Sequence, residues 1–148
     1  MNIKKQKFED VPLFELSSFT LHELNRFGLQ TLMTGDSAVR YKDRYTVSNI
    51  NFTDNSKEYI ANMKADHGLY KDDIIELEDD VVYSREDGLT FETSRAVYNK
   101  NTTVATSDTD YVSYRDKNII KGSFVKYNNS LNRVESKNVV ATYQLKEG

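Results

Sequence analysis

The stretch Ala96-Val97-Tyr98-Asn99-Lys100-Asn101 has the composition of a β-strand end, because two apolar residues and a tyrosine run into polar turn formers. The same order occurs at Ala38–Asp43, Gly68–Asp72 and Phe124–Asn129. The tyrosines of the four copies, Tyr41, Tyr70, Tyr98 and Tyr127, are 29, 28 and 29 residues apart. A constant period of this length is typical of stacked repeats. We therefore expect layers of about one hairpin each, with the tyrosines in a row that lines the interior or marks its rim.

Alternation of apolar and polar residues continues through most of the chain. Tyr59, Ala61, Met63 and Ala65 form one period-two run, and turn formers recur every 8–15 residues. This spacing is typical of an all-β sandwich or roll. We predict a flexible N-terminal arm over residues 1–12 and a single β domain over residues 13–146.

Several local features refine this prediction. Residues 12–33 fit a hairpin. The alternative is a two-turn helix that begins with a capping box at Thr20–Glu23 and ends at Gly28. Gly35-Asp36-Ser37 is predicted as a turn, and the alternation slips by one residue after Ser48, as at a bulge. Asp79 breaks the inward side of the next strand, where we expect an edge or a bulge. Arg85–Gly88 contains the Asp-Gly pair of a hairpin turn.

The composition limits the classes of function. The chain has 148 residues, 38% hydrophobic and 29% charged, with a net charge of −3. A nucleic-acid interface would be basic and clustered, so we expect no nucleic-acid partner. The absence of cysteine excludes thiol catalysis and zinc–thiolate sites.

The residue types that carry chemistry are sparse. Gly35-Asp36-Ser37-Ala38 is similar to the nucleophile block of GDS hydrolases, but no histidine follows His67 to act as its base. His67 without a nearby second histidine is a poor metal ligand, and the acidic run Asp72–Asp80 lacks the glycine of a calcium loop. No glycine-rich phosphate loop is present. We therefore predict no catalytic residues, no metal and no cofactor, and a binding or scaffold role.

If the repeats stack, the inward positions form a continuous apolar trough. Each of these positions also fits an ordinary core residue, so the trough is a hypothesis. The candidates for its lining are Ile75, Leu77, Tyr83, Phe91, Tyr98, Val112, Tyr114, Ile120 and Tyr127.

The repeats resemble a known family. Met63–Tyr70, followed by Ile75–Val81, is similar to the signature of the LptC family, a component of the lipopolysaccharide export system. Thr93–Tyr98, Val104–Asp108 and Ser136–Tyr143 continue the resemblance. It covers roughly residues 15–145 and consists of strand and turn patterns. LptA and the N-terminal domain of LptD, from the same superfamily, are the nearest competitors, and the presence of one domain favours LptC.

The resemblance implies a fold and a function. The fold would be a twisted, open β-jellyroll of stacked antiparallel strands in two sheets. The function would be to receive lipopolysaccharide from the inner-membrane ABC transporter and to pass it to the periplasmic bridge protein. The alternative is a scaffold without ligand that links partners through its edge strands. A continuous apolar cavity open at one end would favour the first, and a filled core the second.

The resemblance also implies partners and a location. The N-terminal edge would dock on the transporter, and the C-terminal edge would accept an LptA-like bridge protein by strand addition. Full-length members act in the periplasm and carry an inner-membrane anchor helix, which we do not find in this chain. The candidate edge residues are Phe19, Leu21, Val139, Ala141 and Tyr143.

Overall fold

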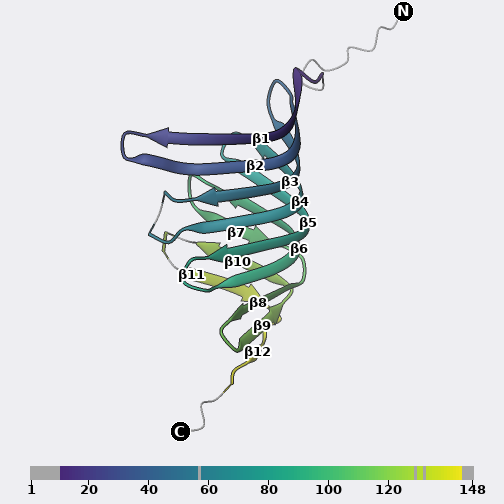
Figure 1. Ribbon diagram of the computed structural model, residues 1–148. Helices are drawn as coiled ribbons and strands as arrows, with labels where there is room; N and C mark the ends of the chain where they lie inside the picture. Colours follow the sequence, from purple (N-terminus) through teal and green to yellow (C-terminus); the bar gives the residue numbers. More distant parts are fainter. Residues whose placement is uncertain (1–10, 57, 129, 132, 145–148) are drawn as a thin grey trace, which may run out of the picture.

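The computed structural model describes residues 11–56, 58–128, 130–131 and 133–144, and these contain twelve β-strands and no helix (Figure 1). The predicted all-β class is confirmed. The predicted arm falls mostly on residues 1–10, outside the described residues. The strands are β1 (Phe14–Asn25), β2 (Gly28–Arg40), β3 (Tyr45–Asp54), β4 (Ala61–Lys71), β5 (Ile74–Arg85), β6 (Thr90–Asn99), β7 (Val104–Ser107), β8 (Tyr111–Arg115), β9 (Asn118–Gly122), β10 (Phe124–Asn128), β11 (Arg133–Lys137) and β12 (Val140–Thr142).

All described strands pair antiparallel in one sheet. Strands β1 to β6 form a meander in which each strand pairs with the next. The predicted β1–β2 hairpin and the predicted turn between β5 and β6 are therefore confirmed. The sheet then forks at β6, because one half of β6 pairs with β7 and the other half with β8. One branch continues as β7, β10 and β11, and the other as β8, β9 and β12.

The long strands bend in the middle. Ser18, Asn49, Asp79 and Asp80 all have positive φ, and the pairing is interrupted at or beside each of them. The predicted irregularity at Asp79 is confirmed as a bulge. The predicted slip after Ser48 is confirmed in the burial pattern, although the strands keep one register across it. A row of bends at this position folds the sheet along a line.

The fold divides the sheet into two walls. We call the part that carries residues 74–78 of β5, with β7, β10 and β11, the first wall. The part that carries residues 81–85 of β5, with β8, β9 and β12, is the second wall. Phe52 of the second wall packs on Tyr98 of the first, with ring centroids 6.1 Å apart. The two sheets expected from the sequence are thus two walls of one hydrogen-bonded sheet, joined along the bends.

The tyrosine row predicted from the repeat is present for three of its four members. Tyr70 pairs with Ile75, Ile75 with Tyr98, and both Tyr98 and Tyr127 with Ala105. Tyr41 lies just beyond β2, and Tyr45 takes its place in the row. Ile75, Tyr98 and Tyr127 are buried, so this part of the row lines the interior.

The expected layer of one hairpin holds for only part of the chain. The periods that end at Tyr70 and at Tyr98 each contain two strands. The period that ends at Tyr127 contains four short strands, β7 to β10. The predicted turn at Gly35-Asp36-Ser37 is also wrong, since these residues continue β2. A Cβ on Gly35 would lie 2.6 Å from Val47 Cγ1 and 2.7 Å from Phe19 Cε1. The glycine therefore allows close packing beside the bend.

Candidate functional site

The space between the walls is the apolar interior of the protein. Six of the nine predicted lining residues are buried there, namely Ile75, Leu77, Tyr83, Phe91, Tyr98 and Tyr127. Ile120, from β9, is partly buried and packs against the same cluster. Alternation along the strands was the signal that identified them, since residues two apart share a face.

The prediction was wrong about the direction of Val112 and Tyr114. Their neighbours Tyr111 and Ser113 are buried instead. Val112 pairs with the exposed Glu92, and the Tyr114 hydroxyl donates a hydrogen bond to the Glu92 carboxylate (2.8 Å). Each face of β8 carries a tyrosine, and Val112 makes the outer face the more apolar of the two. The prediction therefore chose the outer face and missed the buried Tyr111.

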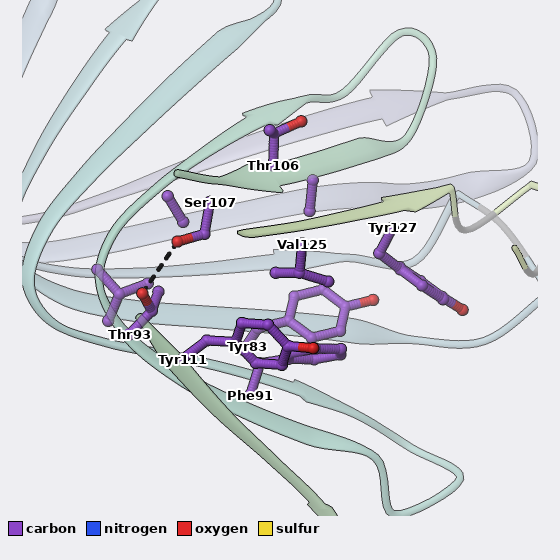
Figure 2. A pocket seen from close by; sticks show the side chains of 11 residues that line it. Tyr83, Phe91, Thr93, Thr106, Ser107, Tyr111, Val125 and Tyr127 are labelled. Atoms are coloured by element: carbon purple, nitrogen blue, oxygen red, sulfur yellow. Dashed lines mark hydrogen bonds between the residues drawn. The ribbon is translucent and has the colours of Figure 1, made fainter. Parts of the chain in front are cut away.

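A cavity lies between the walls at the fork of β6. Its volume is about 30 Å³, room for only one or two water molecules. Figure 2 shows the rings of Tyr83, Phe91 and Tyr111 gathered on one side, with the hydrogen-bonded hydroxyls of Thr93 and Ser107 (2.9 Å) on another. It is lined by Val81, Tyr83, Phe91, Thr93, Ala96, Ala105, Thr106, Ser107, Tyr111, Val125 and Tyr127. Here the walls are in contact, and side chains fill most of the space between them.

A buried hydrogen bond joins the walls. The Tyr98 hydroxyl donates to Asp54 Oδ2 at 2.6 Å, and the two residues are 1% and 2% exposed. The other oxygen, Asp54 Oδ1, accepts hydrogen bonds from the backbone N–H and the hydroxyl of Ser56. Burial and the Asp54 charge raise the pKa of Tyr98, so this hydroxyl remains a neutral donor.

Tyr83 contrasts with Tyr98. Its hydroxyl is buried and has no hydrogen-bond partner among the described residues. Burial is the main cause that raises the pKa of this phenol far above its ordinary value. The hydroxyl is therefore neutral at physiological pH.

A second polar contact, which we call the clasp, joins the walls at the side opposite the bends. It consists of Glu23 in the second wall, Tyr70 in the first wall and Lys100 in the turn after β6. Lys100 Nζ lies 2.7 and 2.6 Å from the two Glu23 carboxylate oxygens. The Tyr70 hydroxyl donates to Glu23 Oε1 at 2.9 Å. The strands of Glu23 and Tyr70 do not pair, so the clasp connects the walls through side chains.

The charges in the clasp stabilise one another. Partial burial opposes ionisation of Glu23, but hydrogen bonds from Lys100 and Tyr70 outweigh it and lower the pKa of the Glu23 carboxyl. Likewise, burial disfavours the charged form of Lys100, but its bond to Glu23 outweighs this and raises the pKa of the Lys100 ammonium. A lowered carboxyl pKa stabilises the folded state above the pKa of the unfolded chain. This contribution is lost as the pH falls through the folded-state pKa.

We predict that Glu23→Gln lowers the free energy of unfolding at pH 7 by about 1 kcal/mol, since the pair is only partly buried. The difference from wild type should shrink as the pH falls below about 4.3, the ordinary pKa of glutamate. Urea unfolding at pH 7 and pH 3 measures both. The control is Glu135→Gln, which removes an exposed ion pair with Arg133 (3.4 Å) and should change little. An equal deficit at both pH values would contradict an electrostatic role.

The sheet ends in unpaired edges. Within the described residues, β1 pairs only with β2, and β12 pairs only with β9. Phe19 and Leu21 of β1 are partly buried against the core. The free edge of β1 therefore offers a partner its backbone groups, and these two side chains contribute less. Val139, Ala141 and Tyr143 are exposed, and Val139 and Tyr143 lie just outside the two ends of β12. Both predicted edge segments thus lie at ends of the sheet.

The chemistry considered for Ser37 and His67 is not assembled. Ser37 pairs with Ser48, which pairs with His67, so one strand separates the serine from the histidine. Neighbouring strands are about 4.8 Å apart, so the backbones at these two residues are about 10 Å apart. The exposed His67 Nε2 instead lies 3.7 Å from Asp79 Oδ2. In the described part of the chain, no group of three His, Asp or Glu side chains is placed to hold a metal ion.

An antiparallel sheet folded over an apolar interior, with unpaired edges at its ends, defines an open β-jellyroll. The family model for lipopolysaccharide-assembly, LptC-related proteins matches residues 2–144, and the chain belongs to this family. Membership implies involvement in lipopolysaccharide transport in the periplasm, as a transport or binding component. No curated protein matches the chain. No helix within the described residues is long and apolar enough to cross a membrane.

Proposed function

We propose that this protein binds the acyl chains of lipopolysaccharide between its two walls and passes the lipid onward during export. The observation that carries the proposal is the apolar interior, which backbone pairing closes at the bends and side chains close at the clasp. Burial of an acyl chain contributes about 0.8 kcal/mol per CH₂ group. A short length of acyl chain between the walls is therefore enough for binding. A site that side chains can open also permits release to the next protein.

The edges supply the partners in this proposal. The inner-membrane ABC transporter docks at the N-terminal edge on β1, and an LptA-like bridge protein adds a strand at the C-terminal edge near β12. Unpaired strand edges offer the backbone donors and acceptors that such strand addition uses. In the full-length protein, an anchor helix would hold the domain at the periplasmic face of the inner membrane.

A second candidate is a scaffold that links partners through the same edges without binding lipid. The filled interior favours it, because the cavity of about 30 Å³ is far below the roughly 300 Å³ of a typical ligand pocket. The two candidates therefore differ in one respect, which is whether the walls separate to admit an acyl chain.

We predict that a photo-crosslinking amino acid at Phe91 forms adducts with lipopolysaccharide. The matched control is the same amino acid at Tyr114, whose side chain lies on the outer face. Adducts should be at least several-fold more abundant at Phe91, as measured on denaturing gels probed for lipopolysaccharide. Absence of adducts at Phe91, in an assay where a known carrier is labelled, would favour the scaffold.

A further inference from the structure

We propose that the Tyr83 hydroxyl determines lipid specificity by hydrogen-bonding an uncharged oxygen on a bound acyl chain. The proposal rests on the proposed function and names a group that selects among lipids. It concerns ligands whose chains carry a hydroxyl, ester or amide oxygen near the point where they enter the interior.

Tyr83 lies on the second wall and is 6% exposed. Its ring is 6.0 Å from the ring of Phe91 and 6.0 Å from that of Tyr127, which belongs to the first wall. Tyr83 also lines the cavity at the fork of β6 (Figure 2). A chain that enters between the walls here would contact this residue.

Among the described residues, the Tyr83 hydroxyl has no hydrogen-bond partner, whereas other tyrosines have one. Tyr98 donates to Asp54, Tyr70 to Glu23, and the Tyr111 hydroxyl lies 2.5 Å from Ser136 Oγ. Leaving a buried hydroxyl unsatisfied destabilises a protein. Phenylalanine would supply the same ring without this cost, as it does at Phe91, directly opposite Tyr83 in the sheet. The hydroxyl therefore has its use in another state of the protein.

The surroundings of Tyr83 limit the kind of ligand atom that it can bind. Burial keeps the Tyr83 phenol neutral, so it can both donate and accept a hydrogen bond. Its ring neighbours Phe91 and Tyr127 are aromatic, and the nearby Arg85 guanidinium is already paired with the Asp87 carboxylate. A phosphate would therefore have to lose its water here at high cost. A neutral oxygen on an otherwise apolar chain fits both conditions.

The test combines stability with lipid preference in Tyr83→Phe. Thermal melting should show an unchanged or higher melting temperature, because an unsatisfied group is removed. A lower melting temperature would overturn the proposal, since the hydroxyl would then have a partner within the protein, such as a buried water. The control is Tyr111→Phe at the same cavity, which loses a hydrogen bond and should melt lower.

Binding is measured by displacement of a fluorescent fatty acid with methyl tetradecanoate and methyl 3-hydroxytetradecanoate, whose oxygens are all uncharged. If Tyr83 bonds a chain hydroxyl, Tyr83→Phe weakens binding of the hydroxylated ester about three- to tenfold and leaves the other unchanged. If it bonds a carbonyl oxygen, binding of both esters weakens equally, which also supports the proposal. Unchanged affinity for both esters would overturn it while leaving the proposed function intact. Failure of the wild type to bind either ester would count against both.

Discussion

Replacing Tyr98 with phenylalanine is expected to lower the free energy of unfolding by about 3 kcal/mol, since the hydroxyl is the partner of a buried charge. The variant keeps the ring that packs on Phe52 but leaves Asp54 Oδ2 without its donor. Asp54 as a whole is only 2% exposed, so its unpaired carboxylate oxygen cannot reach bulk water in compensation. For a domain of this size, the melting temperature should fall by roughly 6–12 °C.

Circular dichroism melts and urea titrations measure this loss, and Tyr83→Phe is the matched control. Both substitutions remove one buried hydroxyl from the same interior, yet we expect only Tyr98→Phe to lose stability. The wild type should also lose stability above about pH 10, where tyrosines of the unfolded chain ionise while Tyr98 stays protonated. Tyr98→Phe should show a shallower loss. A Tyr98→Phe variant as stable as wild type would mean that Asp54 finds another donor.

The strand pattern could be predicted because it depends on local alternation and turn chemistry. The repeat around Tyr70, Tyr98 and Tyr127 also predicted a row, since equal spacing brings equivalent residues into register in a meander. The prediction was inaccurate at Tyr41, where the strand ends before the tyrosine. Register in a sheet is set by turn lengths as well as by the repeat.

The errors in prediction have identifiable causes. On β8 both faces carry apolar or aromatic residues, and only pairing with Phe91 and Thr93 decides that Ser113 and Tyr111 face inward. At Gly35, a glycine next to aspartate and serine has the composition of a turn. Its actual role depends on Val47, twelve residues away, and on Phe19 in the neighbouring strand. Such contacts are fixed by tertiary packing, which single-residue patterns do not contain.

The contacts that join the walls lay beyond sequence reasoning altogether. Asp54 and Tyr98 are 44 residues apart, and Glu23 and Lys100 are 77 apart. Neither pair lies on neighbouring strands. They meet because the sheet bends at residues such as Asn49 and Asp79, which have positive φ. Broken alternation predicted an irregularity at these two places, but it did not predict that the sheet folds there.

Cross-linking the clasp shut is expected to reduce lipid loading at least tenfold. The walls now enclose about 30 Å³, so an acyl chain can enter only if they separate. Separation at the bends would break backbone pairing. Separation at the clasp breaks side-chain contacts alone, namely those of Glu23 with Lys100 and Tyr70 and the hydrogen bond from Tyr98 to Asp54. The clasp is thus the side that opens at the lower energetic cost.

The experiment uses Glu23→Cys with Lys100→Cys in a chain that has no other cysteine. A reducible bis-thiosulfonate linker joins the two thiols, and lipopolysaccharide adducts at Phe91 are compared before and after reduction. The control is Ser17→Cys with Ser37→Cys, two exposed residues paired across β1 and β2, whose linkage leaves the clasp free. We expect full loading in the linked control, little in the linked clasp, and recovery when dithiothreitol removes the linker. Equal loading in the linked clasp would mean that the lipid enters along an open end of the roll, without separation of its walls.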